Sequence, residues 1–197
     1  MWHNLPMSRT ATANLVLLLL LVVGCSSPSS APRFLPANVV LGADAQDPDL
    51  QTWLSPTANK ASWKAVLVEP VEMRVRVDDR KRADALPREL RANLMDFIRL
   101  PKAHAPGPGV LVVKAAITGA RPDDPLVDLG VHQGSRGEGG FTSVQIYAIQ
   151  DGAPVAALDR TIWSHKLTLD ADAAWGRAER ALQQAAGEFA KVLGKGG

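Results

Sequence analysis

The chain has 197 residues, of which 46% are hydrophobic and 21% charged, a composition that fits one globular domain with additional segments. Its 22 Lys and Arg nearly balance its 20 Asp and Glu. This balance gives no support to nucleic-acid binding, which usually requires a concentrated basic face. Cys25 is the single cysteine, so a disulfide within the chain is excluded.

The first predicted element is an export signal. Residues 15–23 are nine consecutive Leu and Val residues, a run that suits a secretory signal and is far shorter than the roughly 20 apolar residues that span a bilayer. Val22-Val23-Gly24-Cys25 ends this run and resembles the bacterial lipobox, in which a small residue precedes the cut and the cysteine is acylated. We predict that residues 1–24 are a lipoprotein signal peptide, cleaved between Gly24 and Cys25, and that Cys25 carries the lipid.

An uncleaved anchor and plain secretion are the alternatives, because a lone cysteine after an apolar segment can also be a buried thiol. Arg9 is the one positive charge before the run, and Met7 offers a second start besides Met1. Lipobox processing resembles a route that adds at least two acyl chains, and two chains give stable attachment. Ser26 rather than Asp follows the cysteine, so we expect the outer membrane, facing the periplasm, rather than the inner membrane.

Residues 25–62 are predicted to form a tether and an irregular arm. Residues 26–32 are rich in Ser and Pro, which is typical of a flexible tether. Three prolines interrupt any helix in residues 33–62. The arm is nevertheless too apolar for a solvated linker, so we expect it to lie against the domain through Phe34, Leu35, Leu41, Leu50, Trp53 and Leu54.

The globular domain is predicted to occupy residues 63–197 and to begin with a strand and a helix. Residues 64–77 change from an apolar run to strict alternation, which predicts one long strand with a bulge or an edge position at Pro70. The charged run 78–82 is interpreted as a solvated loop. Asp84 is the expected N-cap of a helix that ends near Leu100, with Pro87 in its first turn. Its predicted buried stripe comprises Leu86, Leu90, Leu94, Phe97 and Ile98.

The second half of the sequence is predicted to contain three strands. Residues 110–118 are almost continuously apolar, which is typical of a strand covered on both faces. The Gly-rich residues 119–140 lack the Gly-Lys-Ser/Thr of a phosphate-binding loop and are interpreted as a connection. Residues 141–150 and 155–167 predict a hairpin joined by Asp151-Gly152, a pair that favours a type I′ turn.

A last helix is predicted to start at a cap formed by Asp170 or Asp172 and to run to Leu193, with Gly194 at the C′ position. Apolar residues recur along it at spacings of four and three, which predicts one buried face. The element order β-α-β-β-β-α therefore predicts an α+β fold. We expect a single mixed or antiparallel sheet of about four strands, with both helices on one face and an irregular N-terminal arm in front.

The chain offers no recognisable catalytic, cofactor or metal motif. His104, His132 and His165 are far apart in the sequence, and no H-E-x-x-H, C-x-x-C or G-x-S-x-G pattern is present. Asp159 and Arg160 are interpreted as a local ion pair on a solvated sheet face. We therefore predict no catalytic, cofactor-binding or metal-binding residues and a non-enzymatic protein.

Several segments, in order, resemble a bacterial lipoprotein family known as domain of unknown function 3313. They are the lipobox ending at Cys25, Phe34-Leu35, W-K-A-V-L-V-E-P-V at residues 63–71, A-P-G-P-G-V-L at 105–111, A-A-I-T at 115–118, Gly139-Gly140, the hairpin around Asp151-Gly152 and A-L-D-R at 157–160. One departure is Asp151-Gly152-Ala153, where the resemblance leads us to expect Thr-Gly. The resemblance implies a secreted, lipid-anchored protein of a Gram-negative envelope, and it implies no activity.

Three functions follow as hypotheses. The first is an accessory envelope lipoprotein, attached to the membrane by its lipid and bound to an envelope protein, with the exposed edge of the 141–167 hairpin available to partner strands. The second is a carrier of a small apolar ligand or lipid in a pocket between residues 110–118 and the last helix. The third is an unrecognised hydrolase in which His165 or His132 meets a carboxylate or hydroxyl.

Overall fold

A computed structural model describes residues 33–122, 140–164 and 171–194, with the side chains of the last range described from Trp175 onward. Its elements in chain order are β1 (Gly42–Ala43), β2 (Leu50–Leu54), the 3-10 helix η1 (Lys60–Ser62), β3 (Ala65–Val68), β4 (Glu72–Met73), α1 (Arg80–Phe97), β5 (Val110–Arg121), β6 (Phe141–Gln150), β7 (Ala153–Trp163) and α3 (Ala171–Leu193).

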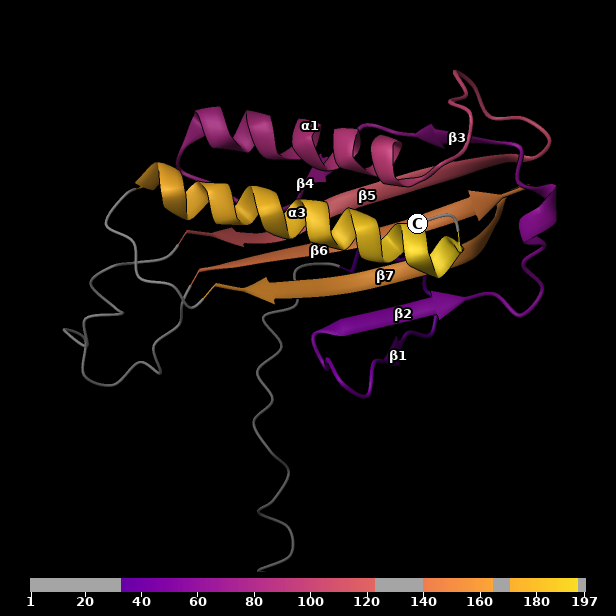
Figure 1. Ribbon diagram of the computed structural model, residues 1–197, viewed down its shortest axis with the longest axis horizontal. Helices are drawn as coiled ribbons and strands as arrows, with labels where there is room; N and C mark the ends of the chain where they lie inside the picture. Colours follow the sequence, from indigo (N-terminus) through magenta and orange to yellow (C-terminus); the bar gives the residue numbers. More distant parts are fainter. Residues whose placement is uncertain (1–32, 123–139, 165–170, 195–197) are drawn as a thin grey trace, which may run out of the picture. The chain divides into compact units, whose positions relative to one another are not determined.

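The strands form one mixed sheet, and both helices lie side by side across one of its faces (Figure 1). The strand order is β1-β2-β7-β6-β5-β3, with β4 also beside β5. β3 and β4 run parallel to β5, and the other neighbouring strands are antiparallel. The predicted α+β class with a mixed sheet and two helices is confirmed, but the predicted number of about four strands is wrong, because the described residues alone form a sheet of seven.

Two of the additional strands lie in the range expected to be irregular. Asp44 closes the turn between β1 and β2, because its Oδ1 accepts hydrogen bonds from the backbone N–H groups of Gln46 and Asp47 at 2.8 and 3.2 Å. β2 then pairs with β7 along its whole length, from Leu50 opposite Arg160 to Leu54 opposite Ala156. Proline breaks helices but is compatible with the turns between short strands, so the prolines do not prevent these strands.

The predicted long strand over residues 64–77 is divided into β3 and β4. Pro70 lies between the two pieces and has no N–H to give to a ladder. Both pieces pair with β5, β3 beside Val110–Val113 and β4 beside residues 116–117. The interruption expected at Pro70 therefore separates two strands instead of producing a bulge in one.

Helix α1 begins earlier than expected. Asp79 is its N-cap, since the Asp79 carboxylate accepts a hydrogen bond from the backbone N–H of Arg82 at 3.1 Å. The run interpreted as a solvated loop is thus the cap and first turn, and Pro87 lies inside the helix. The predicted stripe is confirmed at Leu86, Leu90, Leu94 and Ile98, which are all buried, whereas Phe97 is only partly buried.

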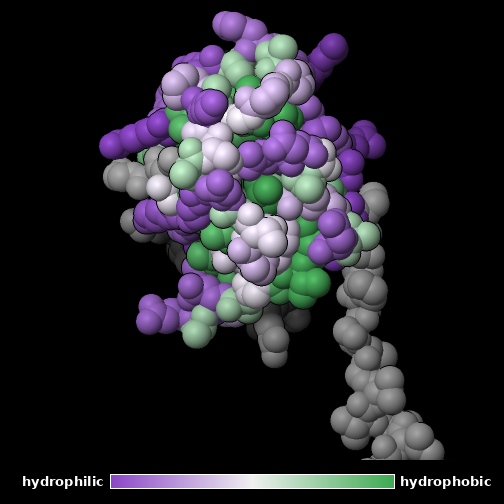
Figure 2. All heavy atoms as spheres, turned by 90° about the vertical axis from the view of Figure 1, so that its right-hand side faces the viewer, coloured by the Kyte–Doolittle hydropathy of each residue, from purple (hydrophilic) through white to green (hydrophobic). Residues whose placement is uncertain are grey.

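In the C-terminal half the predicted hairpin and last helix are confirmed, but β7 ends at Trp163, and Asp172 lies inside α3 and is not its N-cap. Asp151 and Gly152 have φ values of 49° and 81°, as a type I′ turn requires. Gly194 has a φ of 67° directly after α3, which suits the C′ position. Figure 2 looks onto the end of the domain that carries the 151–152 turn, where hydrophilic and hydrophobic side chains are interspersed.

The main core fills the space between the sheet and the helices. β5 contributes Leu111, Val113 and Ile117, and α3 contributes Leu182 and Phe189, all of them completely buried. None of the helices in the described ranges is long and apolar enough to cross a membrane.

β2 pairs with the outer side of the predicted 141–167 hairpin from Ala156 to Arg160, which corrects the expectation that this whole edge is available to partner strands. β7 pairs with β2 on its outer side, and β6 pairs with β5. A hairpin is available to a partner strand only where a backbone edge is unpaired. The sequence did not reveal this because β2 is separated from β7 by most of the domain.

The Arg160 side chain joins the edge of the sheet to α3. Its guanidinium lies 2.7 Å from Asp47 in the β1–β2 connection and 3.1 Å from Glu188 of α3, and the Arg160 residue is only 6% exposed. The Nε atom of Arg160 makes no aligned hydrogen bond with Glu188, so that contact is a charge pair. The predicted ion pair between Asp159 and Arg160 is wrong, because neighbouring residues of a strand point to opposite faces.

We predict that Arg160→Ala lowers the free energy of unfolding by about 3 kcal/mol, because it leaves Glu188 partly buried without its cation. Chemical denaturation of the purified protein measures the change. The double variant Arg160→Met with Glu188→Leu is the matched control and should recover most of the loss. A double variant as unstable as Arg160→Ala would contradict a charge-based role.

Candidate functional site

The structure does not bring the predicted site residues together. Gly24 and Cys25, like His132 and His165, lie outside the described residues. His104 is on the exposed loop between α1 and β5. Within the described ranges, no three His, Cys, Asp or Glu side chains are close enough to share a metal ion.

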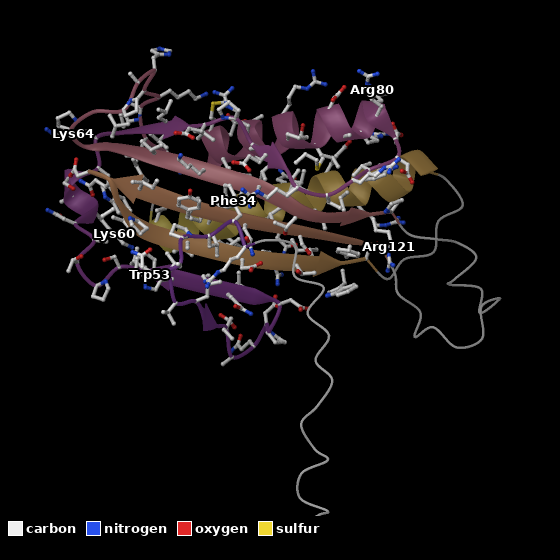
Figure 3. All side chains as sticks on the ribbon, turned by 180° about the vertical axis from the view of Figure 1, so that it is seen from behind. Phe34, Trp53, Lys60, Lys64, Arg80 and Arg121 are labelled. Carbon is white, nitrogen blue, oxygen red and sulfur yellow. The ribbon has the colours of Figure 1, made fainter. Side chains whose placement is uncertain are left out.

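The most distinctive site in the described chain lies on the sheet face opposite the helices, which Figure 3 shows from behind. The chain segment Arg33–Leu41, called here the arm, lies on this face. Leu35 and Val39 of the arm are buried in a second apolar cluster with Ala157 of β7, and Leu41, Trp53 and Tyr147 pack around them. Of the wider range 33–62 that was expected to lie against the domain, this segment does so, and Leu50 and Trp53 also pack against buried clusters, whereas Leu54 is exposed.

Phe34 fixes the start of the arm over the middle of the sheet. Its ring centroid lies 5.2 Å from that of Tyr147 on β6. On the other side, the Arg74 guanidinium lies 4.7 Å from the Phe34 centroid, a cation–π contact, and the Arg74 Nε donates to Glu72 at 2.8 Å. Phe34 therefore connects β6 with the chain around β4.

A polar chain runs from the arm to β7. The Gln145 side-chain oxygen accepts a hydrogen bond from the backbone N–H of Phe34 at 2.8 Å, and its Nε2 donates to Asp159 Oδ2 at 2.7 Å. Gln145 and Asp159 are direct cross-strand partners, so the sheet register fixes this geometry. Burial raises the pKa of Asp159 above its ordinary value, and the Gln145 hydrogen bond and the nearby Arg33 charge offset part of that rise.

A shallow hollow of about 390 Å³ opens beside this polar chain. It is lined by Arg33, Ala37, Val39, Val40, Leu41, Gln51, Gln145 and Asp159. Val40 is 77% exposed, whereas the neighbouring Val39 is completely buried. The lining holds one carboxyl group and one guanidinium and no hydroxyl, thiol or imidazole, so it suits binding better than nucleophilic chemistry.

Sequence reasoning assigned Asp159 to a solvated face and did not connect it with the arm. The alternation of side chains along β7 was the available signal for which face each residue occupies. Asp159 shares its face with Ala157, and Arg160 shares the opposite face with Leu158. Gln145 carried no such signal. Its role depends on the cross-strand register and on a contact with Phe34 across 111 sequence positions.

Residues 34–129 match the model of a family described as protein of unknown function (DUF3313). This match supports the predicted resemblance to that domain over this part of the chain. No curated protein matches the chain.

Several solved structures also resemble the chain, among them the two that follow. The PelC dodecamer from Paraburkholderia phytofirmans is 15% identical, with a TM-score of 0.40, and the match covers 69% of this chain and 93% of that chain. The hypothetical protein CT253 from Chlamydia trachomatis is 10% identical, with a TM-score of 0.36, and the match covers 67% of this chain and 97% of that chain. Neither likeness assigns a function to this chain.

We predict that Asp159→Asn stabilises the protein at neutral pH. The pKa of Asp159 is raised in the folded state, so its carboxyl favours folding most below its unfolded pKa, and this contribution is lost as the pH rises through the higher folded pKa. The variant should therefore exceed the wild type in unfolding free energy at pH 7 and match it at a pH below the ordinary Asp range. Urea denaturation at a series of pH values measures the difference.

Asp84→Asn, at an exposed position of α1, controls for the change in net charge. An advantage of Asp159→Asn that persists unchanged at low pH would contradict the burial of a charged carboxylate as its cause.

Proposed function

We propose that this chain is a lipid-anchored protein of the bacterial cell envelope that acts by binding an envelope partner and has no catalytic activity of its own. Cys25 carries the acyl chains and becomes the first residue of the protein when it is separated from Gly24. The expected location is the outer membrane, with the domain in the periplasm.

One observation carries the proposal: nine Leu and Val residues lead directly into Gly24 and the single cysteine of the chain, and a Ser/Pro-rich segment follows. A structural cysteine has no need of this position, whereas lipoprotein processing requires a small residue before the acylated cysteine. The match to a family of unknown function over residues 34–129 is compatible with the proposal and does not test it.

The start of the domain fits a short attachment. Eight peptide units separate Cys25 from Arg33, and a fully extended chain of that length spans at most about 28 Å. Phe34 and Leu35 then contact the sheet face opposite the helices. The chain length would thus limit the distance between an acylated Cys25 and Arg33 to about 28 Å.

A binding role is favoured over the carrier alternative by the core. A carrier needs a cavity between β5 and α3. Leu111, Leu182 and Phe189 are completely buried in the core cluster that fills this space. The hydrolase alternative depends on His165 or His132, and both lie outside the described residues.

We predict that Cys25→Ser abolishes incorporation of labelled palmitate in living cells and leaves the precursor uncleaved, because acylation precedes removal of the signal peptide. Labelling, followed by the intact mass of the purified protein, measures both effects. The matched control combines Cys25→Ser with Ser30→Cys, which keeps one thiol but places it outside the lipobox. Palmitate on that control, or on Cys25→Ser itself, would contradict the assignment.

A partner should be recovered when the wild-type protein is crosslinked in intact cells. Recovery of uncrosslinked monomer alone would contradict the binding role while leaving the lipid anchor intact. The two parts of the proposal can therefore fail separately.

A further inference from the structure

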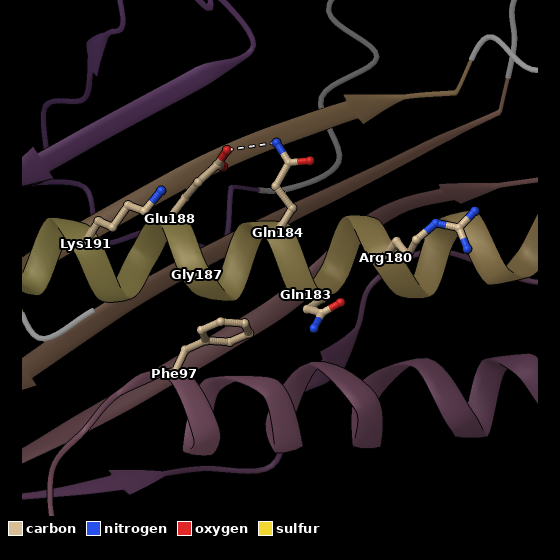
Figure 4. Close-up of a pocket in the computed structure, with 7 residues that line it drawn as sticks. All are labelled: Phe97, Arg180, Gln183, Gln184, Gly187, Glu188 and Lys191. Atoms are coloured by element: carbon tan, nitrogen blue, oxygen red, sulfur yellow. Dashed lines mark hydrogen bonds between the residues drawn. The ribbon is translucent and has the colours of Figure 1, made fainter. Parts of the chain in front are cut away.

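A second hollow lies on the solvent side of α3, against the end of α1 (Figure 4). Its volume is about 570 Å³. It is lined by Phe97, Arg180, Gln183, Gln184, Gly187, Glu188 and Lys191, and we call it the Gly187 hollow. The hollow forms where Gly187 interrupts a row of long side chains, and the Phe97 ring flanks it.

The fold does not require glycine at position 187. A Cβ atom built there would lie 3.7 Å from the nearest Phe97 ring carbon, an ordinary van der Waals contact. Gly187 is also absent from the glycines with positive φ. Because glycine destabilises a helix interior relative to alanine, its presence is explained better by a close approach of another group to the helix than by packing within the domain.

The rim of the hollow carries positive charge. Arg180 and Lys191 are both exposed, and neither forms an ion pair with any of the described residues. They lie on one side of α3, about 16 Å apart along its axis. The acidic residue of the lining, Glu188, is held 3.1 Å from Arg160, which leaves the two cations uncompensated.

We propose that the Gly187 hollow docks an acidic segment of a partner polypeptide. One apolar side chain of the segment fills the space above Gly187 and packs against Phe97. Carboxylates on either side of it meet Arg180 and Lys191, and about five residues of extended chain bridge these two cations. The exposed amide of Gln183 both donates and accepts hydrogen bonds, so it can pair with the partner's peptide groups.

A polypeptide fits these features better than a purely anionic ligand does. The cations alone would suit a phosphate or an anionic lipid surface, but phosphate groups supply no apolar side chain to pack against Phe97 above Gly187. The hollow also lies on the helical face, whereas the arm, which leads towards Cys25, contacts the opposite face. This surface therefore goes beyond the proposed membrane attachment and does not depend on it.

The test uses the purified full chain and a fluorescent peptide with one tryptophan between two runs of glutamate. We expect the peptide to bind, with an affinity that falls as salt is added, and to shift the amide NMR signals of Gln183, Gly187 and Lys191. Gly187→Leu should weaken binding about tenfold, since the leucine occupies the space of the apolar side chain. Arg180→Gln and Lys191→Gln should each weaken it about two- to fivefold.

Gly176 offers the matched control, because it is the other glycine among the described side chains of α3 and does not line the hollow. A Cβ atom there would lie 3.9 Å from Arg180 Nη1, an ordinary contact that leaves this cation in place. Gly176→Ala and Gly187→Ala should both raise the midpoint temperature of thermal unfolding, but only Gly187→Ala should lower the affinity for the peptide. If Gly187→Leu is unstable, the comparison of these two alanine variants tests the docking proposal, and equal affinities of both for the peptide would contradict it.

Two results would overturn the proposal. One is a peptide that does not bind the wild type or binds Gly187→Leu equally well. The other is a preference for phosphatidylglycerol vesicles or inorganic polyphosphate over the peptide, with the same dependence on Arg180 and Lys191, which would assign the surface to a phosphate-bearing ligand.

Discussion

The pleat of β7 directs Asp159 and Arg160 to opposite faces of the sheet, and both layers of the domain depend on that alternation. On the helical face, Arg160 contacts Asp47 and Glu188 and so connects the edge strands with α3. On the other face, Asp159 accepts a hydrogen bond from Gln145, which in turn holds the backbone of Phe34. The buried guanidinium of Arg160 thus connects elements on the helical face of the sheet, and the partly desolvated carboxyl group of Asp159 does so on the other face.

Elements with local signals could be predicted from the sequence. The Asp151-Gly152 turn was predictable because a type I′ hairpin needs two residues that tolerate positive φ. Helix α3 was predictable because its apolar spacing and Gly194 are independent of the rest of the chain. The start of α1 was not, since Asp79 and Asp84 are equally good caps locally. The tertiary ion pair of Arg82 with Glu179, at 2.9 Å, favours the earlier start by holding the first turn on α3.

Elements and sites that depend on distant partners could not be predicted. β2 is a strand because β7 offers it an edge, and β3 and β4 are separate because Pro70 interrupts their pairing with β5. The polar chain under the arm needs the register of β6 and β7 as well as the path of the arm. Gly187 is visible in the sequence as a glycine in a helix, but its meaning depends on Phe97, which a different helix supplies.

The route of the chain also determines how hard the domain is to assemble. Strand β2 pairs with β7, and the arm contacts β6, for example between Phe34 and Gln145, which are 111 positions apart. Contact order is therefore high on this side of the sheet, and closing such long loops slows folding. Until β2 arrives, the outer backbone of β7 is unsatisfied and can pair with another unfolded molecule. β2, from the first part of the domain, thus protects β7 against aggregation. It can do so only after β7, the last of the described strands, has formed.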